Sequence, residues 1–160
     1  MEHVQQMLEP IYNENSKILI LGTFPSVKSR ETEFYYGNPQ NRFWKVIANI
    51  TGCNKYDTVD EKKKMLIDNN IALWDTIESC DIEGSSDSSI TNVVPADLSI
   101  ILNNSLVNRI YVNGDKAFKL YNKYLLKTTG IEAVKLPSTI PANARFTLDK
   151  LIHAWQVIKE

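Results

Sequence analysis

Four short apolar runs, separated by stretches with helical spacing, constrain most strongly how this chain folds. The runs are Lys17–Leu21, Ile71–Trp74, Arg109–Val112 and Ala133–Leu136. The first is apolar at every position from Ile18 to Leu21, as in a strand that is covered on both faces. Strands that alternate with helices predict an α/β fold, in which helices cover both faces of a mainly parallel sheet.

Helical patterns fill the intervals between these runs. Phe43, Val46, Ile47 and Ile50 repeat at helical spacing, and Thr51-Gly52 predicts the end of that helix. Thr58 and Glu61 fit a capping box at the start of the next helix. Three further helices are expected: one capped by Asp115 and closed by Gly130, one over Leu148–Ile158, and a first one carrying Val4, Met7, Leu8 and Ile11. The polar stretch 79–92 predicts either a mobile surface loop or part of a binding rim.

The polar residues that follow each apolar run are the candidates for a binding site. In parallel α/β sheets, ligands bind beyond the carboxyl ends of the strands. This places Gly22 and Asp75 on one rim, together with Asn113 and the segment after Leu136. Asp75 has two interpretations, as a catalytic carboxylate or as the cap of a turn.

Composition excludes several classes of site. At 160 residues we expect a single domain, residues 1–160. A net charge of −1 argues against a broad basic coat for DNA, so any contact with nucleic acid should be local. Only two cysteines (Cys53, Cys80) and two histidines (His3, His153) are present, which argues against zinc or iron–sulfur sites and a central Ser-His-Asp triad.

The same chain carries no sign of a membrane or export signal. No apolar run approaches the ~18 residues of a membrane span. Its first residues lack a basic segment followed by an apolar core. We therefore expect a cytoplasmic protein. We also expect it to be a monomer.

The stretch from Gly22 to Trp44 is the most distinctive part of the chain. Its aromatics, glycines and prolines predict a rigid, shaped loop suited to holding a flat ring. Phe24 could line such a site or simply pack in the core. Tyr36, beside Gly37, is the better candidate for an exposed stacking face. Asn41 falls near the start of the next helix, where it could act in a site or only cap the helix.

Taken together, these motifs resemble the uracil-DNA glycosylase superfamily, and specifically its hypoxanthine (deoxyinosine)-DNA glycosylase branch. The resemblance covers about residues 15 to 158. Its most specific piece is the Tyr-Tyr-Gly block followed by Asn-x-Phe-Trp. The matching residues are Gly22–Ser26, Tyr35–Gly37, Asn41–Trp44, Leu73–Asp75, Gly84–Ile90, Asn113-Gly114, Leu136–Thr139 and Pro141-Ala142.

The resemblance implies both a fold and a reaction. The fold is a three-layer α/β/α sandwich around a four-stranded parallel sheet. The reaction is hydrolysis of the N-glycosidic bond of a deaminated base in DNA, hypoxanthine above all, as a step of base excision repair. No metal or cofactor is needed.

It also implies roles for individual residues. Asn41 would position the water, Phe24 and Tyr36 would hold the flipped base, and Asn113 would read its edge. The DNA backbone would be contacted by Pro137, Ser138 and Thr139. Two departures from the family pattern matter: Phe24 stands where many members have Asp or Asn, and Asn38 stands where a His often precedes the proline.

Three alternatives stay open at this point. The first is a glycosylase for uracil or for thymine in mismatches. The second is a nucleic-acid-binding module of the same fold that has lost the chemistry. The third is a nucleoside hydrolase acting on free inosine.

Overall fold

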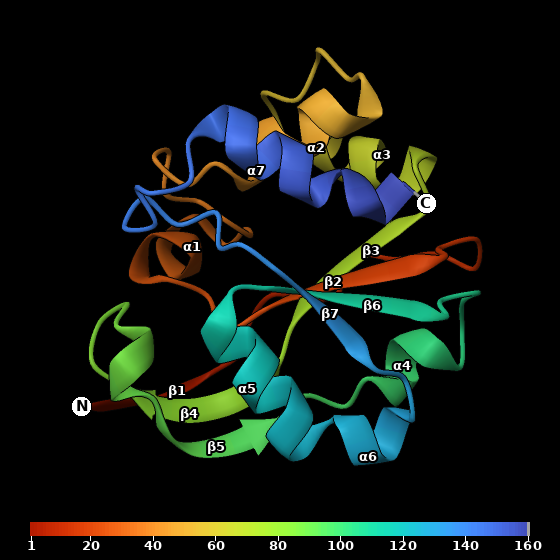
Figure 1. The fold of residues 1–160 in the computed structure, drawn as a ribbon. Coiled ribbons are helices and arrows are strands. Elements are labelled where there is room, and N and C mark those ends of the chain that lie inside the picture. The colour runs from red at the N-terminus through yellow and green to blue at the C-terminus, as the bar shows by residue number, and fades with distance from the viewer. Residues whose placement is uncertain (160) are drawn as a thin grey trace.

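A four-stranded parallel sheet runs through the middle of the molecule (Figure 1). The computed structural model describes residues 1–159. The strands of this sheet are β2 (Ile18–Gly22), β3 (Ile71–Asp75), β6 (Arg109–Asn113) and β7 (Ala133–Leu136), in the order β3-β2-β6-β7. Each apolar run of the sequence forms one of them, so the predicted parallel sheet is confirmed.

Helices form a layer on each side of the sheet, which confirms the three-layer sandwich (Figure 1). One layer holds α2 (Phe43–Thr51), α3 (Val59–Asp68) and α7 (Leu148–Trp155), with η2 (Gln156–Lys159) after it. The other holds α4 (Ser99–Leu102), α5 (Asp115–Tyr124) and α6 (Leu126–Thr129). Helix α1 (Val27–Thr32) lies at the carboxyl ends of the strands, at the left of Figure 1.

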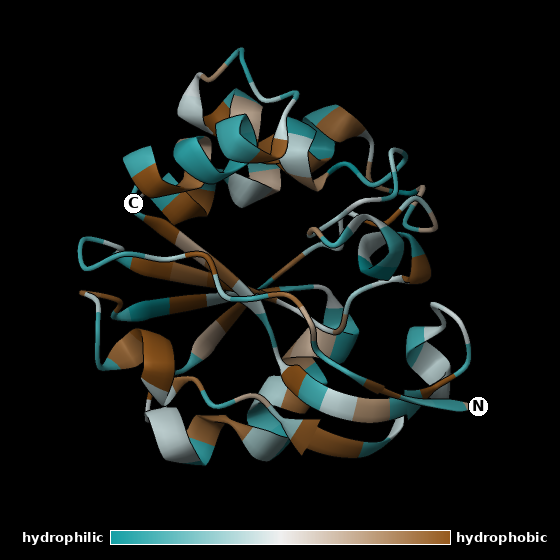
Figure 2. Cartoon of the chain, turned by 180° about the vertical axis from the view of Figure 1, so that it is seen from behind, coloured by the Kyte–Doolittle hydropathy of each residue, from teal (hydrophilic) through white to brown (hydrophobic). Residues whose placement is uncertain are grey.

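The core lies between these layers. In Figure 2 the central strands are largely hydrophobic, whereas many residues of the outer helices are hydrophilic. Every residue of β2 is buried. Phe43 of α2 and Trp155 of α7 are fully buried and meet edge to face, with ring centroids 5.9 Å apart. Each large apolar side chain buried in this way contributes roughly 1.5–3 kcal/mol to stability, so the sheet is a rigid base for the loops at its carboxyl edge.

Helix ends follow the local signals in the sequence, with one correction. Helix α2 ends at Gly52, which has a left-handed φ of 73°, and Thr58 with Glu61 forms the predicted capping box of α3. The prediction that Asp115 caps α5 was wrong, because Gly114 is the capping residue. Asp115 is the first helical residue, and its carboxylate pairs with Lys135 at 2.9 Å. The helical segment is also divided, since α5 ends at Tyr124 and α6 follows it.

A second, antiparallel sheet lies beside α5 and was not predicted. It consists of β1 (Glu2–Gln5), β4 (Ile77–Ile82) and β5 (Thr91–Pro95), in the order β1-β4-β5. The expected first helix over Val4–Ile11 is therefore wrong, because Val4 pairs with Cys80 in a strand. The stretch 79–92 is also not one loop: it contains the end of β4, η1 (Asp87–Ser89) and the start of β5.

Candidate active site

One cavity at the carboxyl edge of the parallel sheet collects most of the predicted site residues. It has a volume of about 470 Å³, within the range of small-molecule sites. The predicted residues that line it are Gly22, Phe24, Tyr36, Asn41, Asp75, Asn113 and Ser138. Pro137 and Thr139 are not among its lining residues. The cavity is also lined by Ser85 and Asp87, from the segment between β4 and β5. That polar stretch therefore contributes to the rim.

The aromatic wall of the cavity is less exposed than the sequence suggests. Tyr36 is half-buried, and Phe43 stacks on it with ring centroids 4.1 Å apart and planes 18° apart. One face of the Tyr36 ring is thus covered. Its backbone has a left-handed φ of 53°, a conformation that non-glycine residues adopt at a cost and that often occurs at functional sites. Phe24 is 8 % exposed and belongs to a small buried cluster that includes Ile77, so it serves both the core and the cavity.

Asn41 lies just before the start of α2 and lines the cavity. The N-cap of α2 is Arg42, so Asn41 is not itself the cap. The Asn41 Oδ1 accepts a hydrogen bond from the backbone N–H of Phe43 at 2.9 Å and another from the Thr139 hydroxyl at 2.8 Å. Because both bonds use Oδ1, they fix the orientation of the amide and give Asn41 a defined position in the cavity.

A buried hydrogen-bond network joins Asn41 to Asn113. The Asn113 amide nitrogen donates to the Thr139 hydroxyl at 3.0 Å and to the Tyr36 hydroxyl at 3.2 Å. The Thr139 backbone N–H donates to Asn113 Oδ1 at 3.1 Å. Thr139 is 0 % exposed, so its side chain cannot reach a DNA backbone in this structure. It links two cavity residues instead, a role that sequence reasoning missed.

Replacing Thr139 by Val should test this link. The side chain keeps nearly the same shape but loses the hydroxyl, so Asn41 and Asn113 each lose one hydrogen bond. We expect a loss of stability of about 1–3 kcal/mol and slower turnover, measured by chemical denaturation and by a kinetic assay. Thr139→Ser keeps the hydroxyl and should recover most of the turnover. Equal turnover for the Val and Ser variants would contradict a positioning role for the hydroxyl.

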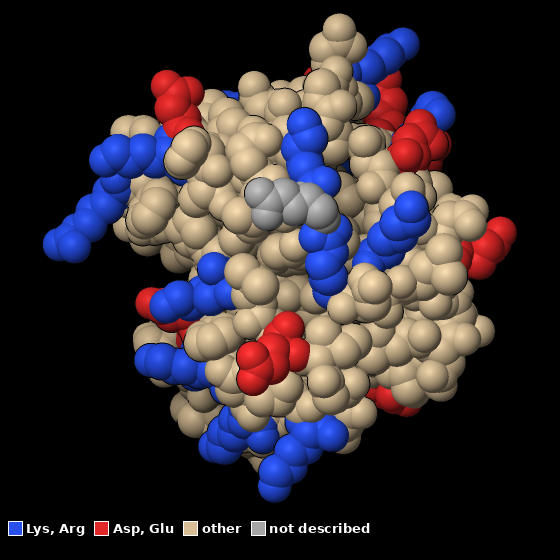
Figure 3. Space-filling model, turned by 45° about the vertical axis from the view of Figure 1, so that its right-hand side comes forward, with Lys and Arg blue, Asp and Glu red and all other residues tan. Residues whose placement is uncertain are grey.

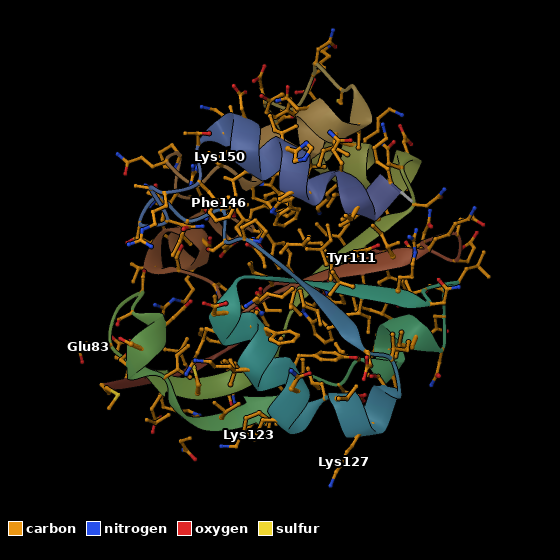
Figure 4. The ribbon with its side chains drawn as sticks, viewed as in Figure 1. Glu83, Tyr111, Lys123, Lys127, Phe146 and Lys150 are labelled. Carbon is orange, nitrogen blue, oxygen red and sulfur yellow. The ribbon has the colours of Figure 1, made fainter. Side chains whose placement is uncertain are left out.

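The loop between β7 and α7 is held in place by carbonyl hydrogen bonds. The Arg42 guanidinium donates to the carbonyls of Ile140 and Asn143, both at 3.1 Å, and to that of Phe146. Phe146 lies just before α7 (Figure 4). The Trp155 indole N–H donates to the Pro137 carbonyl at 2.9 Å. These bonds preorganise the predicted backbone-contacting segment, and Arg42 was not identified from the sequence because its partners are about 100 positions away.

Two glycines, Gly22 and Gly114, leave room for three side chains at the edge of the cavity. A Cβ on Gly114 would lie 3.1 Å from the Cβ of Ser138, and Gly114 also has a left-handed φ of 97°. A Cβ on Gly22 would lie 2.5 Å from Asp75 Oδ1 and 2.9 Å from the Tyr36 hydroxyl. The absence of a side chain at Gly22 therefore allows the Asp75 carboxyl and the Tyr36 hydroxyl to sit beside β2.

The buried Asp75 carboxyl dominates the electrostatics of the cavity. Burial raises the pKa of Asp75 to about 7, and Asp87 adds to the rise, whereas a hydrogen bond from Gln6 lowers it. Burial, followed by the charge of Asp75, raises the pKa of the Tyr36 hydroxyl, which therefore stays protonated.

On the face shown in Figure 3, Lys and Arg side chains lie among Asp and Glu side chains and uncharged surface. Lys127 points away from the sheet (Figure 4).

Residues 1–159 contain neither a cluster of metal ligands nor a helix that could span a membrane. No group of three or more His, Cys, Asp or Glu side chains is arranged to hold a metal ion there. No helix in this part of the chain is long and apolar enough to cross a membrane.

Known proteins resemble this chain over nearly its whole length. Two proteins named hypoxanthine DNA glycosylase are similar to it: one from Methanosarcina acetivorans is 39 % identical over 144 residues, and one from Methanosarcina barkeri is 30 % identical over 143. Each alignment covers 88 % of this chain and 89 % of the relative. The solution structure of a candidate uracil DNA glycosylase from M. acetivorans superposes with a TM-score of 0.79, at 34 % identity, covering 98 % of this chain and 99 % of that one.

The family model points the same way. The model of the uracil DNA glycosylase superfamily matches residues 9–159, which include the parallel sheet and every predicted site residue. This chain belongs to the uracil DNA glycosylase superfamily.

Proposed function

We propose that this protein is a monofunctional DNA glycosylase that hydrolyses the N-glycosidic bond of a deaminated base, with hypoxanthine as the main substrate. One observation carries the proposal: a single cavity brings together the Tyr36 ring, the Asn113 amide and the Asn41 amide. The names of the two Methanosarcina relatives support hypoxanthine as the base. We further propose that residues 1–160 form one domain and act on DNA as a cytoplasmic monomer.

The cavity suits a base that has left the DNA helix. Flipping a nucleotide out of the duplex costs a few kcal/mol, and stacking on an aromatic ring contributes roughly 1–3 kcal/mol per base. The open face of Tyr36 and the edge of Phe24 would hold the ring, while Asn113 would read its polar edge. Because Asn113 donates its two amide hydrogens to Thr139 and Tyr36, its Oδ1 is the atom that would accept a hydrogen bond from the base.

The chemistry rests on water placed by Asn41. An amide is a poor base, so Asn41 contributes orientation rather than proton abstraction. The transition state resembles an oxocarbenium ion, as in other glycoside hydrolyses, with negative charge developing on the departing base. Pro137 and Ser138 would contact the DNA backbone near the lesion through uncharged groups, which is consistent with the net charge of −1.

A panel of substrates tests this function. Matched duplexes carry deoxyinosine, deoxyuridine, a G·T mismatch or no lesion, and free inosine is a fifth substrate. We expect hypoxanthine release from the deoxyinosine duplex to be the fastest, with an abasic site as the second product. Faster release of uracil or thymine would favour the first alternative specificity, and cleavage of free inosine at a similar rate would favour a nucleoside hydrolase. Binding of the lesion without any abasic product would contradict the enzymatic proposal.

A further inference from the structure

The proposed function assigns no role to the Asp75 carboxyl, which lines the cavity. Asp75 ends β3 directly opposite Gly22 of β2, and it is 4 % exposed. Its two oxygens have different surroundings. Oδ2 accepts a hydrogen bond from the Gln6 amide nitrogen at 2.9 Å. Oδ1 lies near Gly22 and the Tyr36 hydroxyl, two residues that line the cavity together with Asp75.

The surroundings of this carboxyl do not favour a buried negative charge. Asp87 of η1 is the charged group that raises the pKa of Asp75. The charge of Asp75 in turn raises the pKa values of Tyr35 and Tyr36, from the loop before α2. Lys28 of α1 also lines the cavity. A buried carboxylate is stable when a cation or several hydrogen bonds compensate it. The Gln6 amide supplies one such bond, and Asp87 adds a like charge; the pKa of about 7 reflects this balance.

We propose that Asp75 is a catalytic acid that protonates the departing base, and that Gln6 positions its proton. This inference rests on the proposed function. Because Gln6 donates to Oδ2, that oxygen acts as an acceptor, and the proton of the neutral acid resides on Oδ1, facing the cavity. Gln6 is itself fixed, since its side-chain oxygen accepts a bond from the Leu8 backbone N–H at 3.0 Å.

Proton transfer from Asp75 would accompany cleavage of the glycosidic bond. The bond between C1′ of the sugar and N9 of hypoxanthine breaks, and its electron pair passes to the base. The Oδ1 proton transfers to an acceptor nitrogen of the purine, so the base leaves as a neutral molecule. The water held by Asn41 forms a bond to C1′ and releases its proton to solvent. The Asp75 carboxylate then takes up a proton from solvent before the next turnover.

A general acid is useful in a site that does little to activate the attacking water. Phe24 is apolar and cannot activate water, and Asn41 would orient water without deprotonating it. General acid catalysis contributes about 10²–10⁴ in rate when the pKa of the acid lies near the working pH. A neutral acid also avoids the repulsion that a fixed carboxylate would exert on the charge developing on the base.

The pH dependence of base release tests this role. Single-turnover rates on a duplex with one deoxyinosine are measured from about pH 5.5 to pH 9. In the wild type we expect a plateau in acid and a fall that approaches tenfold per pH unit above an apparent pKa near 7. Asp75→Asn should lose about 10²-fold on the plateau and should no longer show the fall.

Two further variants move the pKa without removing the acid. Asp87→Asn removes a charge that raises the pKa of Asp75, so the fall should move to lower pH. Gln6→Met removes the hydrogen bond that lowers this pKa, so the fall should move to higher pH while the plateau drops. A residue with only a structural role would not produce shifts in opposite directions.

Thermal unfolding gives a readout independent of activity. An acid whose pKa is raised in the folded state binds more protons folded than unfolded between its two pKa values, so wild-type stability falls as pH rises from about 4 to about 7. Asp75→Asn has no carboxyl at this position, so its stability lacks this pH dependence. The Tm of Asp75→Asn minus the Tm of the wild type should therefore be several degrees higher at about pH 8 than at about pH 5.

The outcomes separate this inference from the proposed function. Release of hypoxanthine with a rate that is constant across the range, or a fall retained in Asp75→Asn, overturns the role of Asp75 alone. A wild-type protein that releases no hypoxanthine at any pH overturns the proposed function and this inference with it.

Discussion

Asn41→Ala is expected to bind deoxyinosine-containing DNA with near wild-type affinity and to release hypoxanthine about 100-fold more slowly or worse. The variant loses the amide that would hold water beneath the sugar, and misplacing a reacting group by about 1 Å costs on the order of 10²-fold. Affinity is measured by fluorescence anisotropy on the duplex, and release by single-turnover kinetics. Near wild-type release would overturn the assignment of Asn41.

This variant also loses a hydrogen bond at the start of a helix, which needs its own control. Removing such a side-chain bond costs about 1 kcal/mol, and the Asn41 amide oxygen accepts the Phe43 backbone N–H at the start of α2. Thr58, the N-cap of α3, likewise accepts the Glu61 backbone N–H at 3.1 Å, and it does not line the cavity. Thr58→Ala should therefore lose similar stability while keeping its rate of base release. If Thr58→Ala slows release as much as Asn41→Ala, the effect is one of stability.

Gly22→Ala should nearly abolish base release through a single methyl group. The backbone at Gly22 does not have a left-handed φ, so alanine is compatible with the strand. The new Cβ would collide with Asp75 Oδ1 at 2.5 Å and with the Tyr36 hydroxyl at 2.9 Å. Both side chains must shift, and we expect release to fall at least about 100-fold, with a stability loss of roughly 1–3 kcal/mol.

Gly130→Ala is the matched control for that change. Gly130 ends α6 with a φ of 67°, and a Cβ there meets no atom within 4 Å. Alanine should strain the backbone and cost about 1 kcal/mol without disturbing the cavity. Comparable rates of base release in the two alanine variants would contradict the steric argument at Gly22.

The parallel sheet was predictable because its strands carry their signal locally. Runs such as Ile18–Leu21 are apolar throughout, and the polar residues after them mark one edge of the sheet. The antiparallel sheet was not predictable in this way. Val4 pairs with Cys80, 76 positions later, and the register is set by that partner rather than by the pattern of residues 2–5.

The same distinction applies to the cavity. Tyr36, Asn41 and Asn113 stand out in the sequence because they follow strands or precede a helix within recognisable motifs. The linking role of Thr139 and the role of Gln6 carry no such signal, since both depend on long-range partners: Asn41 and Asn113 for Thr139, and Asp75 for Gln6. Polar side chains of this kind are identified only when the fold brings their partners together.

The most direct test of the central claim is the identity and amount of what the wild-type protein releases from a duplex with one deoxyinosine. Chromatography with mass detection quantifies free hypoxanthine, and alkaline cleavage of the same sample quantifies abasic sites. We predict free hypoxanthine and abasic sites in equal amounts, and neither from the undamaged duplex. An intact deoxyinosine strand after prolonged incubation with protein that binds it would contradict the claim that this chain is a glycosylase.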